Sequence, residues 1–282
     1  MCRGLRLGVL GGWNLLSQTP GDAPLLRLRG VTKNFGAVQA LRGVDLEVYP
    51  GQVTALVGDN GAGKSTLIKA ISGIFPADAG EVIWDGQQVT VNSPSASSHL
   101  GIATVYQDLA LCDNLDIVQN MFLGREVLKY GLLDEANMEK TAGKTLDDLS
   151  VTTVQSIRQL VGSLSGGQRQ AVAVARAVMW DAKLVILDEP TAALGVTQTA
   201  MVLELIQRLS HQGIAILFIS HNLTDVFAVS DRVAVLRLGR MAEEGPLSDY
   251  DAQTVVQLIT TGTASPTDVD PASSGATSGR EG

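Results

Sequence analysis

A glycine-rich stretch that ends in a lysine and two hydroxyl residues could bind the phosphates of a nucleotide. It follows the apolar run 53–57, which predicts a buried strand, and precedes the run 67–71, which predicts a helix. Glycines in this setting allow a tight turn whose N–H groups converge on phosphate oxygens, beside the positive end of the helix dipole. A chance glycine-rich turn is the weaker alternative, because a strand and a helix flank the match. The candidate phosphate-binding residues are Gly58, Asn60, Gly61, Ala62, Gly63, Lys64, Ser65 and Thr66.

Side chains near this stretch could supply charge and a metal site. Lys64 is expected to reach the β- and γ-phosphates, and the Ser65 hydroxyl is expected to ligate Mg²⁺. Asp188 and Glu189 end the apolar run 184–187, at the strand end where open α/β sheets bind ligands. We expect Asp188 to hold Mg²⁺, directly or through water, and Glu189 to polarise the attacking water as general base. The alternatives are a turn residue for Asp188 and a supporting role for Glu189.

Two further strand ends carry polar residues that could join this set. Gln107 follows the apolar run 102–106 and could reach the metal or the water, or could be an ordinary loop amide. His221 follows the run 214–219 and could bond the γ-phosphate or orient the water, although an isolated histidine is more often structural. The predicted catalytic residues are therefore Glu189, His221, Gln107 and Lys64, and the predicted metal ligands are Ser65, Gln107 and Asp188.

Composition limits the classes of protein to which the chain can belong. Of its 282 residues 45% are hydrophobic, which is enough for a sizeable core, and no apolar run reaches the length that spans a bilayer. The net charge of −8 argues against a nucleic-acid-binding surface. The two cysteines and three histidines show no spacing typical of a disulfide framework or a metal site, which favours a reducing, cytosolic setting.

The pattern along the chain predicts a mostly parallel sheet, because apolar strands alternate with helices. An antiparallel layer is expected from the alternating runs 25–29 and 44–48, and from the run 82–84 before the turn pair Asp85-Gly86. Residues 114–164 mix apolar and polar positions at helical spacing and predict a helical insertion. A further helix is expected from Ser165 to Ala182, with a capping box formed by Ser165 and Gln168, and others over 202–209 and after Lys64.

The two ends of the chain are expected to lie outside the folded domain, which spans residues 25–262. Residues 1–24 faintly resemble a signal peptide, but glycines interrupt the apolar part and no cleavage site follows, so a disordered extension is expected. Residues 263–282 are rich in small and polar residues and predict a disordered tail.

The sequence Leu-Ser-Gly-Gly-Gln at 164–168 matches the signature motif of the ABC transporter ATPases, and the ordered series of motifs over residues 25–262 resembles the nucleotide-binding domain of that family. The resemblance implies an α/β P-loop NTPase core, an antiparallel β subdomain and a helical subdomain that carries the signature. It implies ATP and Mg²⁺ as ligands, and adenine stacking by Phe35. It assigns Gln107 to the Q-loop, Asp188 and Glu189 to the Walker B segment, and His221 to the switch position.

The signature motif itself can bind an anion, since it lies at a predicted helix N-terminus. The chain already has one phosphate loop, and the family's arrangement is that the signature of one subunit caps ATP held by another. The resemblance therefore implies a head-to-tail homodimer that bound ATP holds together. The residues it adds to the nucleotide site are Ser165, Gly166, Gly167 and Gln168.

Residues 105–109, 114–126 and 190–194 resemble the ATPases of simple-sugar importers of the ribose, xylose and fructose type. This resemblance implies transmembrane permease subunits as partners, an extracytoplasmic sugar-binding protein as an indirect partner, and a peripheral place on the cytoplasmic face of the membrane. Residues 114–126 are the candidate permease contact, with a solvent-facing helical surface as the alternative. Only one set of motifs occurs, so the chain is expected to pair with a second copy.

Gly195 departs from the family pattern, which has an aspartate after Leu194 that crosses the dimer interface. Glycine has no side chain for that contact, so communication there is expected to use the backbone or neighbouring residues. Activity is still expected, because Lys64, Glu189 and His221 remain.

The leading hypothesis is an ATP-hydrolysing subunit that drives a sugar permease. One alternative is an ABC ATPase for another cargo, in export or non-sugar import. Another is a soluble ABC ATPase that acts on nucleic acid or ribosomes, which the single cassette, the absence of a heptad insertion and the acidic balance disfavour. A purely structural nucleotide-binding role is weaker still, because the proposed base is present.

Overall fold

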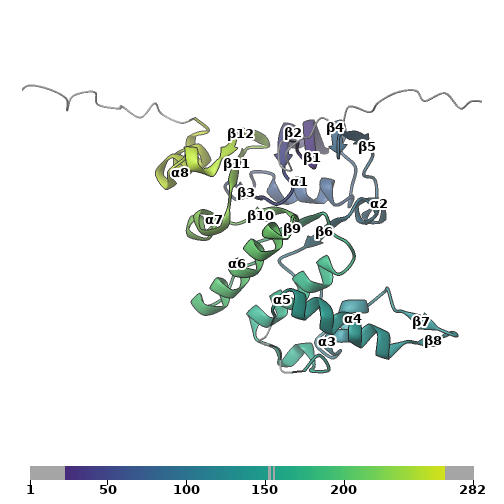
Figure 1. Cartoon of the computed structure of the whole chain (residues 1–282). Coiled ribbons are helices and arrows are strands. Elements are labelled where there is room, and N and C mark those ends of the chain that lie inside the picture. Colours follow the sequence, from purple (N-terminus) through teal and green to yellow (C-terminus); the bar gives the residue numbers. More distant parts are fainter. Residues whose placement is uncertain (1–22, 152–153, 155, 264–282) are drawn as a thin grey trace, which may run out of the picture.

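The computed structural model describes residues 23–151, 154 and 156–263 (Figure 1). The segments 1–24 and 263–282, expected to be disordered, lie outside the described residues apart from positions 23, 24 and 263. Among the described residues no helix is long and apolar enough to cross a membrane.

The central sheet has six strands in the order β12-β11-β3-β10-β9-β6, and every neighbouring pair is parallel except β11 with β12. Both faces are covered, which explains the continuous apolar runs. Along β3, Val53, Ala55 and Val57 join the core on one face, and Leu56 joins the core on the other. The strands are β3 (Val53–Val57), β6 (Ile102–Val105), β9 (Leu184–Asp188), β10 (Ala215–Ile219), β11 (Arg232–Arg237) and β12 (Arg240–Pro246).

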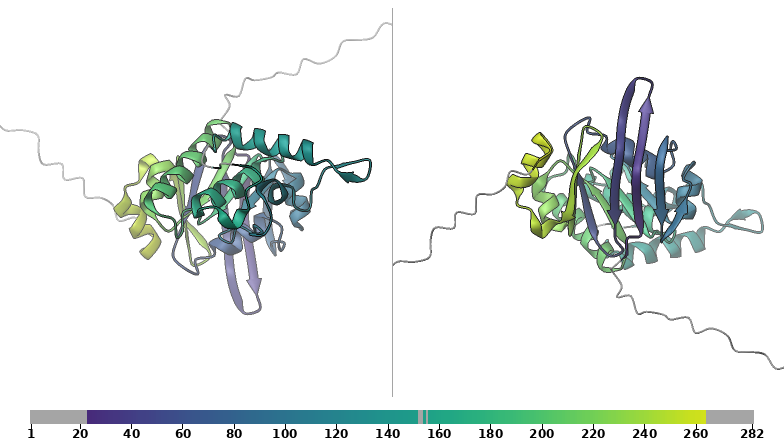
Figure 2. Two further views of the ribbon diagram at one scale, coloured as in Figure 1. Left: turned by 90° about the horizontal axis from the view of Figure 1, so that it is seen from below. Right: turned by 90° about the horizontal axis from the view of Figure 1, so that it is seen from above.

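The expected antiparallel layer is present as a four-stranded sheet in the order β2-β1-β4-β5. Its strands are β1 (Leu26–Phe35), β2 (Val38–Val48), β4 (Ala79–Trp84) and β5 (Gln87–Val89), and Asp85-Gly86 forms the predicted turn. Strands β1 and β2 form a hairpin that projects beyond the body of the molecule (Figure 2). Helix α1 (Lys64–Ile71) packs with both sheets, since Leu67, Ile68 and Ile71 share one core with strands of each.

The helical lobe contains most of the predicted insertion 114–164 and helix α5 (Figure 1). Its elements are α3 (Ile117–Phe122), α4 (Glu135–Asp148), η1 (Val161–Ser163) and α5 (Gly166–Val178). The insertion is not wholly helical: β7 (Leu128–Lys129) and β8 (Leu132–Leu133) form a small hairpin. These strands have two residues each, too short to give a period-two signal.

The remaining helices are α2 (Pro94–His99), α6 (Val196–His211), α7 (Leu223–Val229), η2 (Leu247–Asp249) and α8 (Ala252–Thr261). Helix α5 ends four residues before the predicted end at Ala182, and α6 begins at Val196 rather than at Val202. The first turn of α6 is largely exposed, so the apolar pattern starts after the helix does.

Glu244 on β12 is a carboxylate with only 16% of its side chain exposed. The backbone N–H of Glu47 donates to its Oε1 at 2.9 Å, and Arg232 Nη2 lies 3.8 Å from the same atom. Burial raises the pKa of Glu244 from 4.5 to about 7, and the Glu47 N–H and the Arg232 charge only partly oppose this effect.

We expect Glu244→Gln to flatten the dependence of folding stability on pH. Below pH 4.5 the folded and unfolded chains both hold the proton; between 4.5 and about 7 only the folded chain keeps it. The folded state therefore loses stability as pH rises through this window, by up to about 3 kcal/mol. Glutamine cannot ionise, so the variant should not lose this stability. The difference in Tm between the variant and the normal protein should therefore increase in favour of the variant as the pH rises through the window. The control is Glu243→Gln, an exposed neighbour; parallel Tm curves for Glu244→Gln and the normal protein would contradict the expectation.

Candidate functional site

A cleft of about 710 Å³ lies at the carboxyl ends of β3, β9 and β10. The whole phosphate loop lines it, and so do Gln107, Asp188, Glu189 and His221. These residues are far apart in the sequence, and the parallel strands bring them to one edge of the sheet. The structure therefore gathers the predicted phosphate, metal and catalytic residues in one place. The rest of the lining comes from Val38, Gln39, Ala40, Arg42, Leu238 and Gly239.

The phosphate loop is a tight turn for which two of its glycines are required. A Cβ on Gly58 would lie 2.2 Å from the Leu236 carbonyl oxygen, and one on Gly63, at φ 111°, would lie 2.9 Å from the Ala40 oxygen. Helix α1 begins after Gly63 without a side-chain cap. Its first N–H groups are therefore available to a bound anion, as the sequence predicted.

Lys64 lies at the base of this loop. Its Nζ donates to the Gly58 oxygen at 2.7 Å and to the Asp59 oxygen at 3.0 Å. Burial lowers the pKa of Lys64, and the nearby charges of Glu189, Asp59 and Asp188 oppose that effect. The ammonium group thus lies between the loop and two carboxylates, those of Asp188 at the end of β9 and of Glu189 just after it.

Asp188 is a carboxylate that is costly to ionise without a cation. Burial raises the pKa of Asp188, and the negative charge of Glu189 raises it further. The positive charges of Lys64 and Lys69 lower this pKa and only partly offset the rise. The Ser65 hydroxyl and the Gln107 amide line the same cleft. Hydroxyl, amide and carboxylate oxygens are ligands that suit Mg²⁺, so these residues fit that ion. Among the described residues, no group of three or more His, Cys, Asp or Glu side chains could hold a metal ion by itself.

Glu189 and His221 form a close pair. His221 Nδ1 lies 2.7 Å from Glu189 Oε2, and the His221 backbone N–H donates to the same oxygen at 3.4 Å. The Glu189 side chain is 16% exposed, whereas that of His221 is 71% exposed. Glu189 has φ 52°, a strained conformation for a residue with a side chain, and its N–H donates to the Ile219 oxygen at 3.0 Å. The backbone thus fixes the Glu189 carboxylate at the carboxyl end of β9.

Sequence reasoning missed a buried pair behind these residues. Thr191 Oγ1 donates to Asp225 Oδ2 at 2.7 Å, and both residues are buried. Thr191 lies two residues after Glu189, and Asp225 lies four residues after His221 on α7. The bond therefore ties together the two segments that carry the Glu189–His221 pair. A polar pair across two loops leaves no periodic pattern by which a sequence could show it.

We expect Thr191→Val to lower the turnover of the site without weakening nucleotide binding. Valine keeps the shape but removes the hydroxyl, so the two segments lose the bond that sets their spacing. The rate of ATP hydrolysis should fall roughly ten- to a hundredfold, with KM for ATP little changed. Thr191→Ser should restore the rate because it restores the donor. A Thr191→Val variant that loses only thermal stability would show that the bond is merely structural.

Phe35 does not line the cleft. It ends β1 with 48% of its surface exposed, and its ring packs edge-to-face on Phe75 at 5.3 Å between centroids. Strand β2 instead contributes Val38, which is 66% exposed, together with Gln39 and Arg42. Adenine stacking by Phe35 therefore stays a prediction.

The signature motif also lies outside this cleft, at the start of α5. The predicted capping box is confirmed: Ser165 N donates to Gln168 Oε1 at 2.8 Å, and Gln168 N to Ser165 Oγ at 3.3 Å. A Cβ on Gly166 would lie 2.8 Å from Leu194 Cδ2.

The next glycine is as tightly packed, since a Cβ on Gly167 would lie 3.0 Å from Gln198 Cβ. The signature therefore packs on the loop after Glu189 and the start of α6. Gly195 caps α6 without a side-chain hydrogen bond.

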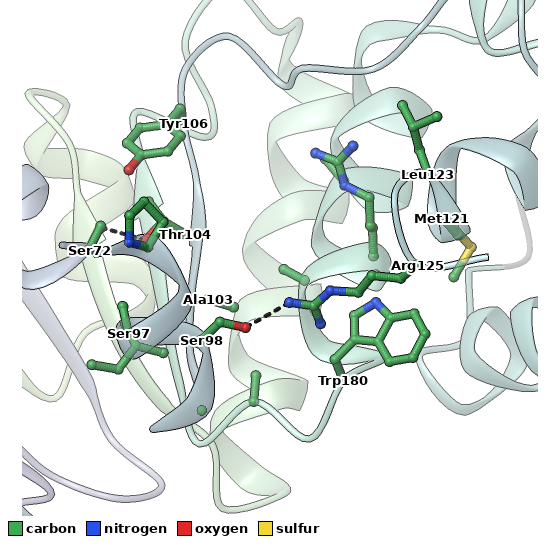
Figure 3. A pocket seen from close by; sticks show the side chains of 17 residues that line it. Ser72, Ser97, Ser98, Ala103, Thr104, Tyr106, Met121, Leu123, Arg125 and Trp180 are labelled. Atoms are coloured by element: carbon green, nitrogen blue, oxygen red, sulfur yellow. Dashed lines mark hydrogen bonds between the residues drawn. The ribbon is translucent and has the colours of Figure 1, made fainter. Parts of the chain in front are cut away.

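A second cleft, of about 320 Å³, lies between the central sheet and the helical lobe (Figure 3). Its lining includes Met121, Leu123 and Trp180, and two arginines but no carboxylate. Arg125 Nη2 donates to Ser98 Oγ at 2.7 Å, and its guanidinium lies 5.2 Å from the Trp180 ring centroid.

The other arginine, Arg176, connects this cleft to the segment that follows Gln107. Its guanidinium donates to the Leu109 oxygen at 3.0 Å and to the Ala110 oxygen at 2.9 Å. Burial lowers the pKa of Arg176. Arg176 therefore links the second cleft to the segment just after Gln107, a residue that lines the first cleft.

Comparisons with known proteins agree with this architecture. The ABC transporter family model matches residues 41–192. The chain is 48% identical over 244 residues to the fructose import ATP-binding protein FrcA of Rhizobium meliloti, and the alignment covers 84% of this chain and 94% of that protein. It is 46% identical over 236 residues to the xylose/arabinose import ATP-binding protein XylG of Sulfolobus acidocaldarius, again covering 84% and 94%.

A ribose import ATP-binding protein, RbsA of Jannaschia sp., is 42% identical over 86% of this chain, which spans about half, 47%, of that relative. Among solved structures, the ADP conformation of MJ1267, an ATP-binding cassette of an ABC transporter, superposes with a TM-score of 0.73 at 28% identity. That match covers 85% of this chain and 96% of the other. The fold, the cleft and the relatives agree, and the chain belongs to the ABC transporter family as one of its ATP-binding cassettes.

Proposed function

We propose that the chain is the ATP-hydrolysing, energy-coupling subunit of an importer for simple sugars, seated on the cytoplasmic face of the membrane. The observation that carries the enzymatic part is one cleft that holds the phosphate loop, Lys64, Asp188 and the Glu189–His221 pair. Support for the sugar comes from relatives named for fructose, xylose or arabinose, and ribose import.

The residues divide the chemistry among them. The N–H groups at the start of α1 and Lys64 bind the β- and γ-phosphates. Glu189 accepts a proton from the attacking water, and His221 orients the carboxylate through their 2.7 Å contact. Ser65 and Asp188, with help from Gln107, would hold Mg²⁺, which would supply positive charge to the bound phosphates.

The signature completes the site of a second copy. Helix α5 begins at Gly166, after its N-cap Ser165, and lies outside the chain's own cleft, so its N-terminal end would cap ATP held by a partner subunit. Two copies arranged head to tail would then enclose two nucleotides.

The permease docks in the second cleft. Met121, Leu123 and Arg125 of the candidate contact segment 114–126 line it, and the cleft joins positive charge to apolar surface. A permease segment with an acidic side chain and apolar neighbours complements this lining. Arg176, which also lines this cleft, donates to backbone oxygens of the segment after Gln107 and so connects the docking site to that segment. The sugar itself is recognised outside this chain, by the permease and an extracytoplasmic binding protein.

The test is uptake of labelled pentoses and hexoses by cells that lack the gene. We expect loss of uptake of one sugar, restored by the normal protein and not by Lys64→Ala. Unchanged uptake of every sugar would overturn the sugar assignment. An ATPase rate measured on the purified protein would separate that outcome from loss of the enzymatic function.

A further inference from the structure

Four of the large hydrophobic residues that are exposed in the described part of the chain lie within the six positions of the β7–β8 hairpin. The exposed fractions are 63% for Leu128, 97% for Tyr130, 75% for Leu132 and 53% for Leu133. Lys129 is the one charged residue between positions 128 and 133. Contiguous apolar surface of this kind on a folded protein marks a place where something binds.

The hairpin carries apolar side chains on both of its faces rather than along one face. Leu128 pairs across the strands with Leu133, and Lys129 pairs with Leu132. Successive side chains of a strand point to opposite faces, so each face carries at least one leucine and Tyr130 occupies the turn. A tip with leucines on both faces matches surroundings that are apolar on both sides.

The tip is held in place rather than loosely attached. Asp134 N donates to the Val127 oxygen at 2.8 Å and closes the base of the hairpin, and Val127 N lies 3.4 Å from Met138 Sδ of α4. Tyr130 at φ 55° and Gly131 at φ 82° form the two central positions of the turn. In Figures 1 and 2 the hairpin projects beyond the rest of the folded domain, away from the other elements.

The base of the hairpin adjoins the second cleft. Leu123 and Arg125 line that cleft, and β7 begins three residues after Arg125. If the permease docks in the cleft, as proposed above, this side of the molecule faces the membrane. The direction of the hairpin thus rests on the proposed function, whereas its exposure and composition do not.

We propose that the tip of the β7–β8 hairpin inserts among the headgroups of a lipid bilayer. Tyrosine is enriched at the membrane interface, where its ring lies among the headgroups. The Lys129 ammonium, 6.0 Å from the Tyr130 ring centroid, lies on a flexible stem that can reach an anionic phosphate while its methylenes stay in apolar surroundings. The leucines on both faces contact the upper acyl chains.

The test is flotation of the purified full chain with vesicles of phosphatidylcholine, with or without phosphatidylglycerol. The double variant Tyr130→Asn/Leu132→Thr keeps turn and strand preferences, because Asn-Gly suits this turn and threonine suits a strand. It should lower the vesicle-bound partition constant about tenfold or more. Lys129→Gln should lower binding roughly fivefold on vesicles with the anionic lipid and leave it unchanged on those without.

Val256→Ser is the matched control, because Val256 is an exposed apolar residue, 48% exposed, on α8. It should bind vesicles like the normal protein. Equal flotation of the normal protein and the double variant would overturn the proposal. So would a defect that the double variant shows only with the permease present, since the tip would then contact protein. The ATPase rate of each variant in solution reports separately on the proposed function and should be unchanged.

Discussion

Lys64→Ala is expected to lower ATP hydrolysis by about a hundred- to a thousandfold. Lys64 is the one lysine or arginine within the phosphate loop, residues 58–66. Its ammonium group donates to the Gly58 and Asp59 oxygens at the turn. Without it, the charge that develops on the phosphates loses its partner, and the loop loses two hydrogen bonds. The measurement is phosphate release by the purified protein at saturating ATP and Mg²⁺.

Lys144→Ala is the control for this change, because Lys144 is an exposed residue of α4 that does not line the cleft. It removes the same charge and should leave the rate within a few-fold of normal. Near-normal turnover by Lys64→Ala would contradict the assignment of the whole cleft, whatever cargo the chain serves.

Glu189→Gln is expected to bind ATP but to hydrolyse it about a hundred to ten thousand times more slowly. The amide is the same size and can still accept the His221 hydrogen bond, but it cannot take a proton from water. The variant should therefore accumulate as an ATP-bound dimer, visible by size-exclusion chromatography with ATP and Mg²⁺.

Glu204→Gln makes the same chemical change at an exposed site on α6 and should hydrolyse ATP normally. Two results would count against the proposed roles. Normal hydrolysis by Glu189→Gln would remove Glu189 as the base. A monomer at saturating ATP and Mg²⁺ would show that the composite site does not form from this chain alone.

Much of the fold follows from the sequence because its signals are local. The continuous apolar runs predicted strands β3, β6, β9 and β10, and the cleft lies at the carboxyl ends of three of them. The capping box at Ser165 and the turn at Asp85-Gly86 were also readable, since each depends on residues a few positions apart.

What the sequence did not reveal depends on contacts between distant segments or on very short elements. The Thr191–Asp225 bond joins residues 34 positions apart. Strand β12, which follows the turn at Gly239, pairs only at the sheet edge, and the β7–β8 strands have two residues each. The packing of Phe35 on Phe75 depends on how the end of β1 meets the segment after α1, and no period or spacing encodes it.

The tight packing of Gly166 on Leu194 and of Gly167 on Gln198 bears on whether the two nucleotide sites of a dimer would act independently. Within one chain, the loop after Glu189 therefore contacts the signature, which we propose as a cap over the other nucleotide, and we expect a displacement of that loop to move the signature with it. In a dimer, a displacement at the first nucleotide would loosen the cap over the second at the same moment. The two sites would then hydrolyse ATP cooperatively rather than independently, and the ATP dependence of turnover would be sigmoidal.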